Sequence, residues 1–388
     1  MTEMIYGSIP AQRGEPILPK WWRTVDRWTL ICVVFLLGIG LLLGLAATPP
    51  LAERNGYEPF HYVQLQFMFV GIGGFAMLCT SMMSPTGVRR FAIGIIFLLS
   101  FVAIIFLPVF GTDYGKGAVR WYSLSIGSVQ PSEFLKPGFI VAAAWLLAAS
   151  REVRGPPGFS LSFALCLFLC ALLALQPDFG QACLLFFGWG VMYFVAGAPI
   201  LVLVVLLGGS VVLGTLAYQG SEHFARRIDG FLNPEIDPTT QLGFAANAIR
   251  EGGLIGVGVG EGQVKRSLPD AHSDFIIAVA AEEYGLLMVF VIITLYVVIA
   301  IRSLIRLLRD RDLFVRLAGT GLCAVFTMQA IINLSVAVRL LPAKGMTLPF
   351  ISYGGSSLLA SGLTIGMLLA LTRTRPQGEF GEILRGKV

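Results

Sequence analysis

The 388-residue chain is 56% apolar and only 13% charged, with a net charge of +5 and a mean hydropathy of +0.78. A soluble globular domain needs more charged surface, so this composition predicts a chain solvated by lipid. The basic residues fall between apolar stretches, which favours solvated flanks of membrane helices over a nucleic-acid patch. The alternating pattern of a membrane barrel is absent, so the sequence predicts an all-α polytopic membrane protein.

Hydropathy predicts about ten transmembrane helices, each near the roughly 20 residues that cross a ~30 Å hydrocarbon core. They are expected at 28–48, 61–82, 91–110, 132–149, 160–176, 180–197, 200–218, 275–301, 314–337 and 353–372. The sixth and seventh are separated only by a kink at 197–199. We expect a single membrane domain with tails at 1–27 and 373–388 and one large loop, 219–274, between the seventh and eighth helices.

The distribution of Lys and Arg predicts the side on which each loop lies. With a cytoplasmic N-terminus, the basic loops around 89–90, 151–154 and 302–316 and the basic C-terminal tail all fall inside. The loops 111–131, 219–274 and 338–352 then lie outside. The first 27 residues lack the pattern of a cleaved signal peptide and are expected to remain as a cytoplasmic tail.

Each outside loop carries basic residues, which the positive-inside tendency disfavours. Ordinary solvation of a loop is one explanation, and a lipid phosphate or pyrophosphate bound at the outer leaflet is the other. The candidates for contact with that phosphate or its substrate are Lys116, Arg120, Trp121, Arg226, Lys265, Lys344 and Ser352.

Asp274 is the last polar residue before the apolar eighth span, at its expected outer mouth. It suits a helix N-cap or a general base, and the two roles are compatible. His272 is a further candidate contact with the substrate, although lone histidines more often serve as hydrogen-bonding scaffolds. Within the spans, Glu133 and Lys136 are three residues apart and are expected to pair. Glu282 is expected to be a buried acidic group two turns below Asp274.

Two features of the large loop are notable. Residues 240–253 are typical of a short helix, capped by Thr240, whose apolar side is expected to face the membrane. The Gly-rich stretch 256–262 lacks the dinucleotide pattern, and its flexible backbone near Lys265 suits the wrapping of an anion. The six cysteines lie in apolar spans without a zinc spacing, so no cofactor is identifiable, and dependence on a divalent cation is left open.

Taken together, these motifs resemble the SEDS family (shape, elongation, division and sporulation) of bacterial peptidoglycan polymerases. The resemblance rests on GAVRWYSL…SVQPSEFLK, QPDFGQ, RRIDGFLNPEIDP, GVGVGEGQVK…LPDAHSDFIIAVAAEEYG and PAKGMTLPFISYGGSS. The last motif, and the short spacing between GVGVGEG and LPDAHSDF, favour the cell-division (FtsW) branch over the elongation (RodA) branch. LPDAHSDF stands where LPEAHTDF is more usual, which keeps the acidic and hydroxyl character.

The resemblance implies polymerisation of lipid II on the outer face of the bacterial inner membrane during cell division. The acceptor's sugar hydroxyl would attack the donor's anomeric carbon with inversion, and undecaprenyl pyrophosphate would leave. Asp274 matches the family's essential aspartate and would take the proton. The implied partners are a class B penicillin-binding protein, other division proteins and membrane lipids, without nucleic acid. A lipid II flippase, an elongation-type polymerase and a scaffold without chemistry are the alternatives.

Overall fold

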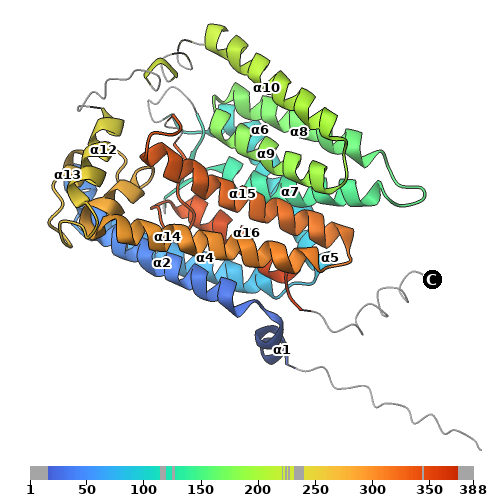
Figure 1. The fold of residues 1–388 in the computed structure, drawn as a ribbon, viewed down its shortest axis with the longest axis horizontal. Helices are drawn as coiled ribbons and strands as arrows, with labels where there is room; N and C mark the ends of the chain where they lie inside the picture. The colour runs from blue at the N-terminus through green and yellow to red at the C-terminus, as the bar shows by residue number, and fades with distance from the viewer. Residues whose placement is uncertain are drawn as a thin grey trace, which may run out of the picture.

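The computed structural model describes residues 16–113, 119–124, 127–220, 222, 225, 228–230, 240–342 and 345–374, which form a bundle of helices (Figure 1). In this part of the chain, seven helical segments are long and apolar enough to cross a membrane. They are α2 (Arg27–Ala47), α4 (His61–Ser81), the continuous run Pro85–Phe110, α7 (Pro131–Ala149), α8 (Gly158–Leu175), α14 (Ile276–Leu308) and α15 (Leu313–Ala337). The all-α membrane fold is therefore confirmed.

Three further helices coincide with the remaining predicted spans. They are α9 (Phe179–Val195), α10 (Ile200–Gly220) and α16 (Gly355–Leu371). A turn with Gly197 at a φ of 86° separates α9 from α10, so the kink in the sequence does divide two helices. In Figure 1, α10 lies at the upper edge of the bundle, beyond α9. The number of membrane crossings stays a prediction.

Small residues let the central helices approach closely, as is usual where helices associate within lipid. A Cβ atom on Gly362 of α16 would lie 2.4 Å from the carbonyl oxygen of Gly73 in α4. A Cβ atom on Gly138 of α7 would lie 2.8 Å from backbone atoms of Phe97. Phe97 ends the π-helical turn η1 (Ala92–Phe97), which joins α5 (Pro85–Phe91) to α6 (Leu98–Phe110). These contacts fix α4 to α16 and α7 to η1.

The end of the bundle that carries Asp274 is built from short elements. They are α3 (Pro49–Arg54), the antiparallel strands β1 (Tyr122–Leu124) and β2 (Gly127–Val129), α12 (Gln241–Gly252) and α13 (Val264–Ser267). Figure 1 places α12 and α13 at the left, around the neighbouring ends of α2 and α14. The sequence predicted α12 but not the strand pair, since each strand has only three residues.

The helix α12 has the predicted cap but not the predicted environment. The Thr240 side chain accepts a hydrogen bond from the backbone N–H of Gly243 at 3.2 Å. Ala245 and Ala248 are fully buried, and α12 packs against α14. The expectation that the apolar side of this helix faces the membrane is therefore wrong. A neighbouring protein segment covers that side, and sequence periodicity cannot distinguish a protein surface from a lipid surface.

Gly252 provides a test of this packing. A Cβ atom there would lie 1.8 Å from the carbonyl oxygen of Ala281, so Gly252→Ala is expected to lower the stability of the folded protein by about 1–3 kcal/mol. Thermal unfolding in detergent micelles measures the change. Gly208→Ala in α10 is the matched control, because no atom lies within 4 Å of the added Cβ. Equal melting temperatures for the two variants would contradict the close contact between α12 and α14.

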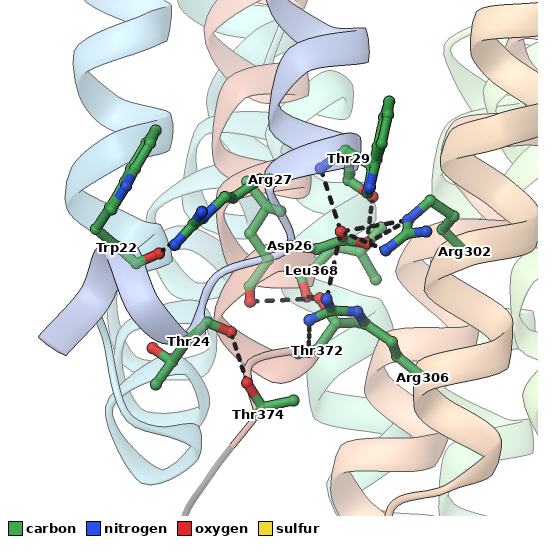
Figure 2. Close-up of polar contacts among 12 residues, drawn as sticks. Trp22, Thr24, Asp26, Arg27, Thr29, Arg302, Arg306, Leu368, Thr372 and Thr374 are labelled. Atoms are coloured by element: carbon green, nitrogen blue, oxygen red, sulfur yellow. Dashed lines mark hydrogen bonds and ion pairs between the residues drawn. The ribbon is translucent and has the colours of Figure 1, made fainter.

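At the opposite end of the bundle, Asp26 connects the first and eighth predicted spans (Figure 2). Its carboxylate is 1% exposed and accepts hydrogen bonds from the Thr29 hydroxyl at 3.0 Å and from the Arg302 guanidinium at 2.9 Å. Arg306 lies 3.3 Å from the same carboxylate and donates to the carbonyl oxygen of Thr372 at 3.1 Å. This cluster, which we call the Asp26 cluster, joins the start of α2 to the ends of α14 and α16.

The two ends of the described chain meet beside this cluster. The backbone N–H of Thr374 donates to the carbonyl oxygen of Thr24 at 3.1 Å, and Arg373 donates to the Thr24 hydroxyl at 2.9 Å. Thr24 ends α1 (Ile17–Thr24), whose Trp21 is buried and donates to the Ser81 hydroxyl at 3.0 Å. The short helix before the first span is therefore anchored to the bundle.

Asp26→Asn is expected to destabilise the protein by about 1–3 kcal/mol at neutral pH, since it removes hydrogen bonds to a charged, buried group. Burial by itself raises the pKa of Asp26, but the hydrogen bond from Arg302 and the charge of Arg306 outweigh it and hold that pKa below 3.8. The contribution of Asp26 is therefore complete above pH 3.8 and is lost as the pH falls through the lower, folded-state pKa. The difference in melting temperature between the wild type and the variant should be smaller at pH 3 than at pH 7. An equal gap at both values would contradict the prediction.

Candidate active site

The helix α14 is interrupted at Gly285, which adopts φ 74° and ψ −179°. A buried helix, 276–284, therefore precedes the longer helix 286–308. An interruption leaves backbone groups without helical partners, and within a membrane protein neighbouring segments must supply them. Here the loop after α12 does so. Its backbone bonds join Val257 to Glu282, Gly258 to Glu283, Leu286 to Gly253 and Leu287 to Leu254, at 2.9–3.3 Å.

The side chains of Glu282 and Glu283 bind the Gly-rich segment 256–262 and the start of α13, which both come after α12 in the chain. Glu282 accepts hydrogen bonds from the backbone N–H groups of Val264 and Lys265 at 2.8 and 3.0 Å. Glu283 accepts from the backbone N–H of Gly260 at 3.2 Å and pairs with the buried ammonium group of Lys265. Glu282 is buried, as expected. In the Gly-rich stretch the Gly260 N–H donates to the Glu283 carboxylate, and four further N–H groups, those of residues 256, 257, 258 and 261, donate to backbone carbonyl oxygens, so these five are used within the protein.

Asp274 lies in a turn that precedes α14. Phe275 occupies the N-cap position, without a side-chain capping bond, so the alternative of Asp274 as the N-cap is wrong. The backbone N–H of Asp274 donates instead to the carbonyl oxygen of Asp270 at 3.1 Å. The turn was missed because the sequence shows only where the apolar run begins, and the last residues before a helix do not reveal their dihedral angles.

Two neighbouring segments fix the backbone at Asp274. The Asn333 side-chain amide of α15 donates to the carbonyl oxygens of Asp274 at 3.0 Å and Met346 at 2.6 Å. The Ser352 hydroxyl donates to the carbonyl oxygen of Ser273 and accepts from the backbone N–H of Leu348 at 2.8 Å. Ser352 thus lies beside Asp274 and bonds to the backbone there, while its contact with the substrate stays a prediction. Asn333 was missed, because it lies inside an apolar span and no motif marks it.

The carboxylate of Asp274 lies next to the left-handed turn at Gly345, which has a φ of 65°. A Cβ atom on Gly345 would lie 3.7 Å from Oδ2 of Asp274. His272 is close by, and its carbonyl oxygen accepts from the backbone N–H of Tyr353 at 2.9 Å. Gly345 therefore lies in contact range of the carboxylate, and His272 links the turn to the segment before α16.

A row of aromatic rings begins at His272. The ring of Tyr353 lies 5.8 Å from the His272 ring and 5.6 Å from the Tyr62 ring, both edge-on. Burial, with a smaller effect from Tyr62, raises the pKa of Tyr353 to about 12. Its phenol is therefore protonated at neutral pH. Tyr62 was missed, and the stretch EPFHYVQ at the start of the second span was the signal, since aromatic residues gather at membrane interfaces.

Arg120 and Trp121 serve a different contact. The Arg120 guanidinium donates to the carbonyl oxygens of Gln176 at 3.1 Å and Pro177 at 2.6 Å. Trp121 accepts a backbone hydrogen bond from Thr112 at 2.8 Å. Arg120 therefore secures the turn between α8 and α9. Lys116, Arg226 and Lys344 lie outside the described residues.

Glu133 and Lys136 form the buried pair that their spacing predicts, with 2.8 Å between ammonium and carboxylate. The Gln181 amide donates to Glu133 at 2.6 Å, and Lys136 donates to the side-chain oxygen of Gln329 at 2.8 Å. Gln329 in turn donates to the carbonyl oxygen of Thr347 at 3.1 Å. The network joins α7, α9 and α15 to the segment 345–352, which contacts the Asp274 turn.

Residues 27–377 match the model of a protein family described as cell cycle protein (FtsW, RodA, SpoVE). A relative from Caulobacter vibrioides, named probable peptidoglycan glycosyltransferase FtsW, is 42% identical over 378 residues, or 96% of each chain. A relative of the same name from Trichlorobacter lovleyi is 34% identical over 357 residues, 89% of this chain and 93% of the other.

Solved structures agree with this relationship. One similar chain comes from a peptidoglycan synthase complex that coordinates polymerization and crosslinking, with a TM-score of 0.74 and 27% identity over 90% of this chain and 97% of that one. The rod shape determining protein RodA of Thermus thermophilus has a TM-score of 0.66 and 26% identity over 92% and 99%. The chain is therefore an FtsW-type member of the SEDS family, the group of cell cycle proteins that its motifs resemble.

Proposed function

We propose that this protein is a peptidoglycan glycosyltransferase that polymerises lipid II, with Asp274 as its general base. The observation that carries the proposal is the placement of Asp274. Its backbone is held by Asn333 and by the bond between Ser352 and Ser273, and its carboxylate lies close to the turn at Gly345. A carboxylate on a backbone that neighbouring segments fix in place suits proton transfer to a positioned substrate.

In the proposed reaction, the hydroxyl oxygen of the acceptor sugar bonds to the anomeric carbon of the donor. The bond from that carbon to the pyrophosphate oxygen breaks, and undecaprenyl pyrophosphate leaves with the electron pair. The hydroxyl proton passes to the carboxylate of Asp274. A single displacement of this kind inverts the anomeric centre and needs one base, without a covalent intermediate.

The pyrophosphate leaving group needs positive charge near it. Of the basic residues singled out from the sequence, Lys265 is paired with Glu283, and Arg120 is bonded to backbone carbonyls. We therefore assign the leaving-group contacts first to Lys116, Arg226 and Lys344. The protonated phenol of Tyr353 and the ring of His272 are proposed donors to the sugars or their phosphates.

The proposed setting is the inner membrane at the bacterial division site, with both termini in the cytoplasm. The basic short loops support that orientation. A class B penicillin-binding protein is the proposed partner, since a similar chain belongs to a peptidoglycan synthase complex. Other division proteins and the surrounding lipids complete the expected contacts.

The test is polymerisation of labelled lipid II by the purified protein, alone and with its penicillin-binding partner. Glycan chains that lengthen with time are the expected product. A second assay uses vesicles that contain the protein and have lipid II in one leaflet. Translocation of lipid II without formation of polymer would contradict the proposal and indicate a flippase. Parallel reactions with Mg²⁺ and with EDTA determine whether polymerisation depends on a divalent cation.

A further inference from the structure

A cavity with a volume of about 660 Å³ lies at the Asp274 end of the bundle. It opens between the end of α2, the short helix α3, the segment 259–266 and the residue before the break in α14. Its apolar wall is formed by Leu42, Leu45 and Val259, and its polar wall contains Glu53, Arg54 and Arg266. The volume lies within the range of about 300–1,000 Å³ that is usual for small-molecule sites.

This cavity is separate from the candidate active site. None of its lining residues is among those that contact the Asp274 turn, namely Asn333, Gly345, Ser352 and Tyr353. Tyr284, on its wall, lies eight residues after Ile276, the first residue of α14, which is about 12 Å along that helix. A ligand in this cavity would therefore not be the group that reacts at Asp274.

The charges of the polar wall favour an anion. Arg54 donates to the carbonyl oxygen of Arg266, which brings the two arginine residues to one side of the cavity. The Arg266 guanidinium has no hydrogen-bond or ion-pair partner among the described residues. The charge of Lys265 is balanced by Glu283, and Glu53 balances one arginine, so one positive charge is in excess. One phosphodiester group would neutralise it.

The apolar wall faces the surroundings of the bundle. Leu42 and Leu45 lie on α2, a helix long enough to span a membrane, and remain 49% and 45% exposed. A ligand that fills both walls must therefore carry an alkyl chain as well as an anionic head. We propose that the cavity binds an anionic glycerophospholipid, with its phosphate at Arg54 and Arg266 and an acyl chain along Leu42 and Leu45. This site does not depend on the proposed function.

The experiment is native mass spectrometry of the full chain in detergent, titrated with phosphatidylglycerol, together with melting curves at each lipid concentration. The wild-type protein should retain one phosphatidylglycerol and melt at a higher temperature as the lipid is added. Arg54→Gln with Arg266→Gln should weaken this binding at least tenfold. Arg250→Gln, an exposed arginine of α12 outside the cavity, is the matched control and should bind as the wild type does.

Several results would overturn the assignment. Unchanged binding by the double variant would exclude this site. Equal binding of soluble glycerol phosphate would exclude the role of the acyl chain, and displacement of phosphatidylglycerol by tenfold less undecaprenyl phosphate would make the ligand an isoprenoid lipid instead. If the double variant melts early without lipid, Arg266→Gln alone is measured, because that side chain has no partner in the described protein to lose.

Discussion

The substitution Asp274→Asn is expected to abolish the polymerisation of lipid II by the purified protein. An amide has the size of a carboxylate but does not accept the proton of an attacking hydroxyl, and loss of a positioned base lowers a rate by about 10²–10⁴-fold. The Asp274→Asn variant should still fold, because the bonds from Asn333 and Ser352 reach backbone carbonyl oxygens, which the substitution leaves in place. The rate of glycan synthesis, measured with the penicillin-binding partner present, gives the result.

Glu261→Gln is the matched control for this experiment. Glu261 is an exposed acid at the same end of the bundle, and among the described residues only its backbone makes hydrogen bonds. It should polymerise lipid II at the wild-type rate. Full activity of Asp274→Asn would remove Asp274 from the mechanism, whereas the family membership would stand, since it does not depend on this residue.

Removal of the charge of Lys136 is expected to be the most destabilising single change in the buried network. Lys136→Met leaves the carboxylate of Glu133 inside the bundle with the Gln181 amide as its one remaining side-chain partner in the described part of the chain. The loss of one member of a buried ion pair costs about 3–5 kcal/mol, because the other charge stays desolvated. The free energy of unfolding in detergent micelles is the measurement.

A double variant shows whether the loss of stability in Lys136→Met comes from the unpaired charge or from altered packing. Lys136→Met with Glu133→Gln removes both charges and should recover much of the stability that Lys136→Met loses. If the double variant is as unstable as the single one, packing around Pro137 and Gln329 is responsible and the uncompensated charge is not. Activity should follow stability, since Gln329 also holds the Thr347 carbonyl in the segment beside Asp274.

The sequence by itself determined the membrane class, the positions of the helices and the family. Long apolar runs specify helices in lipid without reference to the rest of the chain, because each helix satisfies its own backbone. The pair of Glu133 and Lys136 and the cap at Thr240 were also predictable, since their partners lie within one helical turn.

Only the tertiary structure decided what surrounds Asp274. Asn333 and Ser352 approach its turn from residues 59 and 79 positions away in the chain, and no periodicity signals such contacts. The interruption at Gly285 and the loop bonds that compensate for it depend on two segments meeting in space. The same reason explains why Lys265, basic and near a glycine-rich stretch, pairs with Glu283. Whether a charged side chain binds a ligand or forms an ion pair within the protein depends on the groups that the fold places next to it.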